Sequence, residues 1–187
     1  MSINRQNLSI VIVTIKSEKI IHQCISSIDK DIPITVVENS NNLKFKNELE
    51  DTYSNVNCLL TNHNIGMGSG NNLGIKSSIT NYVLILNPDV ILEKNTINEL
   101  IEASKKISDF TILSPISSDN LYPNYKISNN KSLIKNEDLP FQVKSVDGYS
   151  MIFNKKNIDK IIRTKNFDYN YFDENFFMYL ENDDLCK

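Results

Sequence analysis

The residues Asn87-Pro88-Asp89 interrupt an apolar stretch of the sequence in a way that places a carboxylate at the end of a strand. The stretch reads YVLILNPDVIL, and its first part is a continuous apolar run, typical of a strand buried on both faces. Pro88 must end that strand because it has no N–H to donate to a neighbouring strand. Asp89 is therefore expected at the carboxyl edge of a sheet, where open α/β sheets bind their ligands.

Other polar side chains also follow predicted strands. Glu38 and Asn39 close the run ITVVEN, and Asp147 lies beside Gly148. Each of them alone could be an ordinary turn residue or helix N-cap, and Asp89 could form only an Asx-turn. Their shared edge favours a ligand site, because a carboxylate there can hold a hard divalent cation that bridges and neutralises a diphosphate.

Four of the five glycines lie within the stretch NIGMGSGNNLGI, as Gly66, Gly68, Gly70 and Gly74. This concentration between a strand and a helix indicates backbone that needs a positive φ or a close approach to another group. A flexible loop with a helix cap is the alternative. The spacing fits neither the Rossmann fingerprint nor a P-loop. We expect Gly66 to serve ligand binding and to matter little for stability, because a surface loop has little packing to lose.

Apolar runs and amphipathic stretches alternate along the first part of the chain. The predicted strands are Leu8–Ile15, Ile34–Asn39, Val56–Leu60, Tyr82–Leu86 and Phe110–Pro115. The predicted helices between them are Ile20–Ile28, Leu43–Tyr53, Asn71–Thr80 and Thr96–Ile107. This alternation is typical of an α/β fold with a doubly wound, mostly parallel sheet and helices on both faces.

The pattern loosens after residue 115. Ser117–Leu139 is polar and poor in periodicity, which indicates a long excursion with a short hairpin around YPNYKI. Strand-like residues then stand on both sides of Gly148, and a helix is predicted from about Lys156 to Arg163. No linker or internal repeat is visible, so residues 1–187 are expected to form a single domain.

Composition excludes several classes of protein. The net charge is −3 and no Lys/Arg stripe is present, which argues against nucleic-acid binding. The three cysteines share no metal-binding or redox spacing, which indicates reduced thiols in the cytoplasm, most simply as small core residues. The apolar stretch near the start is far shorter than the roughly 20 residues of a membrane span, and it has no signal-peptide cleavage site.

Six stretches of the chain resemble, in the expected order, one family of enzymes. They are LSIVIVTIKSEKIIHQCISSI, VVENSNN, NIGMGSGNNLGI, LILNPDV, DGYSMIFNKK and FDENFFMYLENDDLCK. The family is that of the inverting nucleotide-sugar glycosyltransferases with the GT-A (Rossmann-like) fold, family 2. The resemblance is strongest to the bacterial rhamnosyltransferase-like enzymes that build cell-surface polysaccharide. Together the stretches cover nearly the whole chain.

The resemblance implies roles for particular residues. Asp89 would bind Mg²⁺ or Mn²⁺, and Glu181 or Asp183 would be the general base. The nucleotide and donor sugar would be lined by Thr14, Glu38, Asn39, Asn64, Gly66, Asn72, Asn87 and Gly148. Residues 1–115 would form the nucleotide-binding half, and residues 116–187 the acceptor-side and catalytic half.

The resemblance also implies partners. The donor would be a UDP- or dTDP-sugar, and the acceptor a saccharide or a lipid-linked saccharide. The enzyme would work in the cytoplasm, with at most a peripheral contact at the inner face of the membrane.

Two departures from the family concern the nucleotide and the catalytic motif. Glu38 stands where the family usually has Asp, and Asn182 stands where it has the catalytic Asp. The chain also ends inside that motif's helix, so a C-terminally shortened chain is expected. The alternatives are a nucleotide-sugar-binding domain without turnover and a sugar nucleotidyltransferase, although TIKSEK lacks the glycines that the latter needs. The acidic residues around Asn182 could also be only a favourable helix N-terminus.

Overall fold

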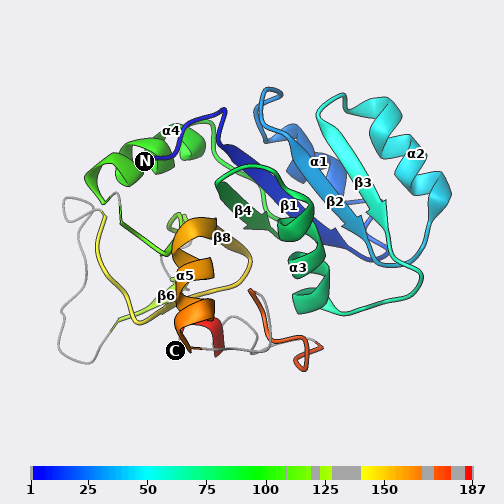
Figure 1. The fold of residues 1–187 in the computed structure, drawn as a ribbon. Helices are drawn as coiled ribbons and strands as arrows, with labels where there is room; N and C mark the ends of the chain where they lie inside the picture. The colour runs from blue at the N-terminus through cyan, green and yellow to red at the C-terminus, as the bar shows by residue number, and fades with distance from the viewer. Residues whose placement is uncertain are drawn as a thin grey trace.

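The centre of the protein is a six-stranded sheet with the strand order β3-β2-β1-β4-β8-β5 (Figure 1). The computed structural model describes residues 2–107, 109–118, 123–127, 140–165, 171–177 and 184–186. Its strands are β1 (Leu8–Thr14), β2 (Ile34–Glu38), β3 (Val56–Leu60), β4 (Tyr82–Leu86), β5 (Ile112–Leu113) and β8 (Ser150–Asn154). Strands β1 to β4 are parallel, and β8 is antiparallel to both β4 and β5. The predicted mostly parallel sheet is confirmed.

Helices cover both faces of the sheet. They are α1 (Ile21–Ser26), α2 (Leu43–Thr52), α3 (Met67–Ser77), α4 (Thr96–Lys106) and α5 (Lys155–Lys165). Figure 1 shows α3 and α5 in front of the sheet, while α1, α2 and α4 contribute to the core on the other face. Within the described part of the chain, no helix is long and apolar enough to cross a membrane.

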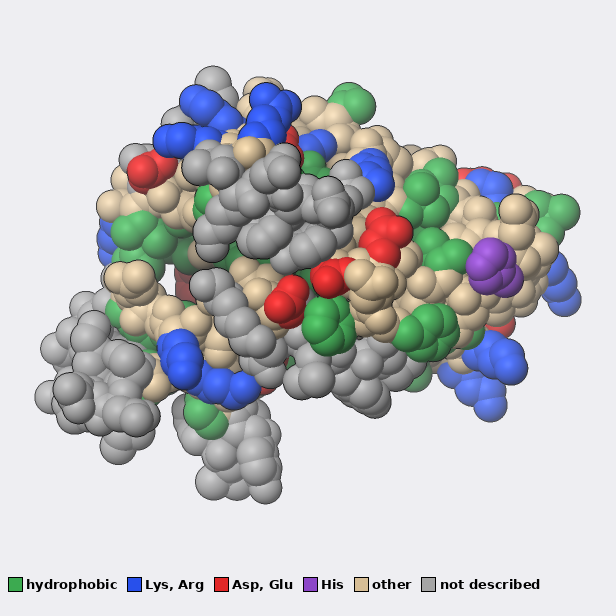
Figure 2. Space-filling view, turned by 60° about the horizontal axis from the view of Figure 1, so that its bottom comes forward, with side chains coloured by type: hydrophobic (Ala, Val, Ile, Leu, Met, Phe, Trp, Pro, Cys, Tyr) green, Lys and Arg blue, Asp and Glu red, His purple; other side chains and the backbone are tan. Residues whose placement is uncertain are grey.

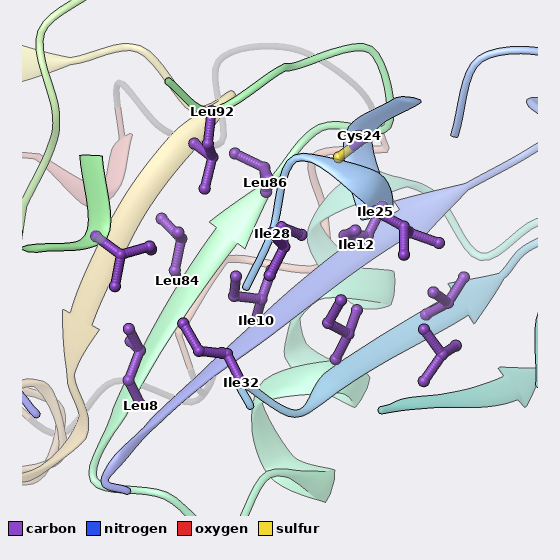
Figure 3. Close-up of a cluster of buried hydrophobic side chains, with 14 of the residues drawn as sticks. Leu8, Ile10, Ile12, Cys24, Ile25, Ile28, Ile32, Leu84, Leu86 and Leu92 are labelled. Carbon is purple, nitrogen blue, oxygen red and sulfur yellow. The ribbon is translucent and has the colours of Figure 1, made fainter. Parts of the chain in front are cut away.

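Successive side chains of a strand point to opposite faces of the sheet, so the hydrophobic core is divided between the two faces. Ile10 and Ile12 of β1 pack with α1 and α4 in the larger cluster (Figure 3), and Val11 between them packs with α3 on the opposite face. Cys24 and Cys58 are buried in the larger cluster as free thiols, as expected from the sequence, and burial raises the pKa of both to about 12.

Helix α3 begins four residues before the predicted start, inside the glycine-rich stretch. Glycine is a poor helix former, so packing against the sheet must compensate. A Cβ built on Gly74 would lie 2.3 Å from Cγ1 of Val11, and one on Gly70 would lie 2.8 Å from Cγ1 of Val13. These glycines therefore let α3 approach β1 closely, and the alternative of a flexible loop is wrong for this part of the stretch.

The chain after β4 differs from the prediction in two places. Strand β5 has only two residues, fewer than predicted from FTILSP. The hairpin expected around YPNYKI is wrong, because β6 (Tyr125–Lys126) pairs instead with the distant strand β7 (Ser145–Val146). This pairing depends on a contact between remote segments, which local propensity cannot indicate. Most of the predicted excursion lies outside the described residues.

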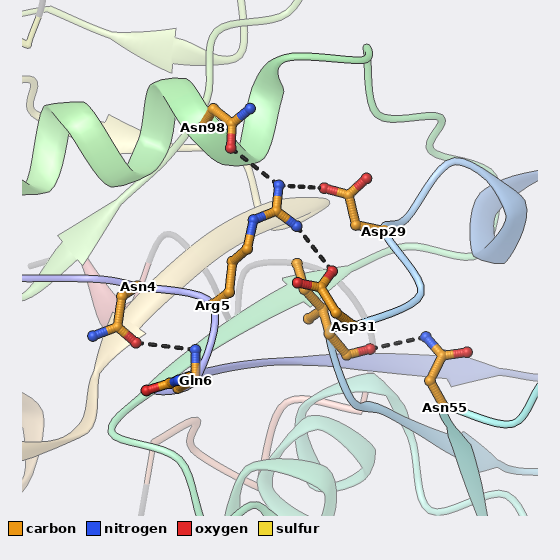
Figure 4. Close-up of polar contacts among 8 residues, drawn as sticks. Asn4, Arg5, Gln6, Asp29, Asp31, Asn55 and Asn98 are labelled. Atoms are coloured by element: carbon orange, nitrogen blue, oxygen red, sulfur yellow. Dashed lines mark hydrogen bonds and ion pairs between the residues drawn. The ribbon is translucent and has the colours of Figure 1, made fainter.

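Arg5 connects three segments at the amino end of the sheet (Figure 4). Its guanidinium forms ion pairs with Asp29 (2.7 Å) and Asp31 (2.9 Å), and it donates a hydrogen bond to Asn98 (3.0 Å). These side chains are partly exposed, so each pair contributes little to stability. The network lies at the opposite end of the sheet from the candidate site.

Candidate functional site

The carboxyl ends of β1 and β2 form one side of the candidate site. Thr14 and Glu38, the last residues of these strands, are partners in the parallel register. The backbone N–H of Asn39 donates to the carbonyl of Thr14 at 2.8 Å, which extends the pairing one residue further. The structure thus brings together three of the residues that the sequence predicts to line a nucleotide.

Glu38 is fully buried, and its carboxylate closes the turn that follows β2. One carboxylate oxygen accepts two hydrogen bonds, one from the backbone N–H of Ser40 (2.9 Å) and one from the Ser40 hydroxyl. The other oxygen accepts from the backbone N–H of Asn42 at 2.6 Å. Asn41 between them has a positive φ of 58°. Glu38 therefore shapes the turn, and Ser40 and Asn42 are site residues that the sequence analysis missed.

Asn39 and Asn64 fix the start of the glycine-rich stretch. The Asn39 amide donates to the carbonyl of Gly66 (3.0 Å) and accepts from the hydroxyl of Thr61 (3.0 Å), and its side chain is only 2% exposed. The Asn64 side chain accepts from the backbone N–H of Gly66 at 3.0 Å. Both the nitrogen and the oxygen of the Asn39 amide form hydrogen bonds within the protein, so the role of Asn39 is to hold Gly66 against the sheet.

The residues after β4 form the second side of the site. Val11 pairs with Ile85, so Asn87 and Pro88 continue alongside the last residues of β1. The backbone N–H of Asn87 donates to the carbonyl of Tyr149 at 2.9 Å, which places the turn at Gly148 directly beside Asn87. The antiparallel strand β8 starts at this edge with Ser150 paired to Leu86, so the structure brings Asn87 and Gly148 together.

Asp89 lies at the same edge with an exposed side chain. Burial raises the pKa of the Cys24 thiol, and the negative charge of Asp89 adds to this shift, so the carboxylate lies close to α1. Among the described residues no group of three or more His, Cys, Asp and Glu side chains could hold a metal ion. A single accessible carboxylate still fits Mg²⁺ or Mn²⁺, which take oxygen ligands and commonly share them with a phosphorylated substrate and water.

Two of the buried polar atoms near this edge have no hydrogen-bond partner in the described part of the chain. They are the hydroxyl oxygens of Thr14 and Ser150, both on residues that are 1% exposed. Buried hydroxyls normally find a partner, and such an exception calls for an explanation by an absent group or water. The Thr14 hydroxyl fits its predicted contact with a ligand.

Asn72 departs from the prediction, because its amide faces the protein. It forms hydrogen bonds with the backbone of Phe172 in both directions, at 2.9 Å each. Gly66, which was expected to approach a ligand, instead touches the backbone of Phe177. The predicted bases Glu181 and Asp183 lie outside the described residues.

Figure 2 looks toward the end of the molecule that lies at the bottom of Figure 1, where α3 begins and where Tyr171–Phe177 lie. Among the side chains visible there, a few Asp and Glu side chains lie near the centre, and most of the Lys and Arg side chains lie toward the margins.

Comparison with known proteins identifies the family. Residues 9–172 match the sequence profile described as glycosyl transferase family 2. The chain belongs to glycosyl transferase family 2. A relative from Haloferax volcanii, the low-salt glycan biosynthesis hexosyltransferase Agl10, is 27% identical across 96% of this chain. The chain spans 60% of the length of that relative.

Solved structures agree with a GT-A fold for this family 2 chain. The S. aureus protein TarS, residues 1–349 in complex with UDP, aligns with a TM-score of 0.63 and 16% identity, covering 96% of this chain and 54% of TarS. The mannosyltransferase PcManGT from Pyrobaculum calidifontis, in complex with GDP-Man and Mn²⁺, aligns with a TM-score of 0.60 and 11% identity. That alignment covers 83% of this chain and 46% of PcManGT. The predicted fold class is therefore confirmed.

Proposed function

We propose that the chain transfers a sugar from a nucleotide-diphosphate donor to an acceptor hydroxyl with inversion at the anomeric carbon. The observation that carries this proposal is that two sets of predicted site residues lie side by side at the carboxyl edge of the sheet. Thr14 and Glu38 end β1 and β2 there, and Asn87, Asp89 and Gly148 lie next to them. This is the edge where doubly wound sheets bind nucleotides.

The donor would lie across this edge. The base and ribose would contact the turn shaped by Glu38 and the hydroxyl of Thr14, which has no hydrogen-bond partner among the described residues, and the diphosphate would extend toward Asp89. The donor sugar would then lie beside the turn at Gly148. Family membership and the UDP, UDP-GlcNAc and GDP-Man complexes of TarS and PcManGT support a nucleotide-sugar donor.

A divalent cation, Mg²⁺ or Mn²⁺, would be held by Asp89 together with the diphosphate. When bound, it offsets negative charge on the departing nucleoside diphosphate. The accessible carboxylate of Asp89 supports such an ion. The Mn²⁺ in the PcManGT complex is consistent with this choice.

In the reaction, the acceptor oxygen attacks the anomeric carbon as the bond to the diphosphate breaks, and the acceptor's proton passes to a carboxylate. Glu181 is the proposed base, with Asp183 as the alternative, because Asn182 cannot take a proton. The acceptor would be a saccharide or a lipid-linked saccharide, a choice supported by the glycan-biosynthesis role named for Agl10.

Proton NMR of the transfer product tests this proposal. Incubation with an α-linked nucleotide sugar, Mn²⁺ and a saccharide acceptor should yield a β-linked product. An α-linked product would contradict inversion. Donor binding without transfer or hydrolysis would instead favour a nucleotide-sugar-binding domain without turnover, a function that Asn182 in the catalytic motif supports.

A further inference from the structure

Asn72 holds the backbone of a segment that is distant in sequence. Its Nδ2 donates to the carbonyl of Phe172 and its Oδ1 accepts from the N–H of the same residue, both at 2.9 Å. Nδ2 also donates to the carboxylate of Glu174 at 3.0 Å. Asn72 is 1% exposed, so these bonds are shielded from water. Because the Asn72 amide bonds both the N–H and the carbonyl of Phe172, it fixes the position and orientation of the Phe172 backbone.

The first turn of α3 holds the other end of the same segment. The N–H of Met67 donates to the carbonyl of Phe177 at 3.0 Å. Gly66, with a φ of 87°, allows this approach, because a Cβ there would lie 2.6 Å from the Phe177 oxygen. We call Gly66, Met67 and Asn72 the α3 seat, and the segment Tyr171–Phe177 lies on it.

Aromatic packing holds the segment from the opposite side. The rings of Tyr171 and Phe172 meet the ring of Phe153 on β8 edge to face, with centroids 6.2 and 5.6 Å away. Burial raises the pKa of Tyr171 to about 12, with further contributions from the charge of Asp159 on α5 and from the hydrogen bond that the Tyr171 hydroxyl donates to that carboxylate. The segment is thus fixed between α3, β8 and α5.

The α3 seat is continuous with the nucleotide side of the site. Gly66 belongs to the seat, and its carbonyl accepts from the side chain of Asn39, which follows β2. On the other side, the proposed base Glu181 is only four residues beyond Phe177 in the sequence. A chain of that length spans at most about 14 Å, so the position of Phe177 limits where the base can lie.

We propose that Asn72 is a positioning residue for glycosyl transfer: it sets the chain that carries the base relative to the bound donor without touching the donor. This inference rests on the proposed function. It predicts that loss of the Asn72 bonds slows the chemical step and leaves donor affinity nearly unchanged, because the nucleotide contacts come from other elements.

The test compares Asn72→Ala with a control at the other end of the same helix. Lys155 donates to the carbonyls of Ser78 (2.7 Å) and Ile75 (3.3 Å), where α3 ends, and Lys155→Met removes this anchor without touching the seat. Turnover of the nucleotide sugar and its dissociation constant would be measured for the full chain, well below each variant's melting temperature. Asn72→Asp is the second variant, because it can still accept from Phe172 but cannot donate to it.

We expect kcat to fall at least tenfold in Asn72→Ala and in Asn72→Asp, with the donor Kd within about threefold of wild type. Lys155→Met should lower the melting temperature but keep the wild-type kcat. A wild-type kcat in the Asn72 variants, or a donor Kd that rises as much as kcat falls, would overturn the inference. Failure of the wild type to bind any donor would instead contradict the proposed function.

Discussion

Gly66 and Phe177 are in such close contact that no side chain fits between them. A Cβ on Gly66 would lie 2.6 Å from the carbonyl oxygen of Phe177, and Gly66 has a φ of 87°. Two residues that are far apart in the sequence thus meet where α3 begins. The contact makes Gly66 part of the packed structure, so the expectation that it matters little for stability is not supported.

Gly66→Ala should destabilise the protein. The positive φ, which glycine adopts freely, becomes strained with a side chain, and the added Cβ overpacks the contact with Phe177. Together these effects should lower the free energy of unfolding by about 2 kcal/mol or more, which corresponds to a decrease of roughly 4–8 °C in melting temperature. Gly68→Ala is the matched control. Its Cβ would lie 3.4 Å from Cβ of Phe172, an ordinary contact, and alanine favours a helix. Calorimetry that finds equal melting temperatures for the two variants would contradict this account of the seat.

Glu38→Gln should also destabilise the fold. Its carboxylate accepts bonds from two backbone N–H groups and one hydroxyl, and an amide NH₂ in its place would face another donor. The expected loss is about 1–3 kcal/mol in denaturant unfolding. Glu48→Gln on α2, where the side chain is 52% exposed, should change stability by less than about 0.5 kcal/mol. Equal unfolding curves for both variants would show that the turn after β2 does not depend on Glu38.

Glu50 should make stability depend on acid pH. The hydrogen bond from Lys46 and then that from the N–H of Cys58 lower the pKa of Glu50 in the folded protein. A lowered pKa stabilises the fold above the unfolded-state pKa of about 4.3, and the gain is lost as pH falls through the folded-state pKa. The stability difference between wild type and Glu50→Gln should therefore shrink from pH 7 to pH 3. A constant difference across that range would contradict the assignment.

The sheet and its carboxyl edge could be predicted because their signals are local. The apolar run of β4 ends at Leu86, just before Asn87-Pro88-Asp89, and the continuous burial of β1 and β4 matches their predominantly apolar sequences. Parallel strands then bring Thr14, Glu38 and Asn87 to one edge by topology alone. The order of the strands in the sheet did not have to be known to predict that these residues share an edge.

The roles of Asn72 and Gly66 could not be predicted because their partners are remote. Asn72 binds a residue 100 positions away, and nothing around Asn72 indicates that its amide turns toward the protein. The partners of Glu38 are only two and four residues away, yet the sequence does not show whether a carboxylate faces a ligand or its own backbone. Asn42 did offer a signal, since it precedes α2 and its side chain caps that helix by accepting from Phe45.

Metal-dependent binding of a nucleoside diphosphate through Asp89 is the central claim, and the melting temperature measures it most directly. With Mn²⁺ and the nucleotide at 100 times its Kd, wild type should gain about 2.7 kcal/mol, or roughly 5–10 °C. Asp89→Ala should lose the part of this shift that depends on Mn²⁺, whereas Glu93→Gln, an exposed carboxylate in the same connection, should keep it. The absence of any shift in wild type with UDP, dTDP or GDP and Mn²⁺, or an equal shift in Asp89→Ala, would contradict the account.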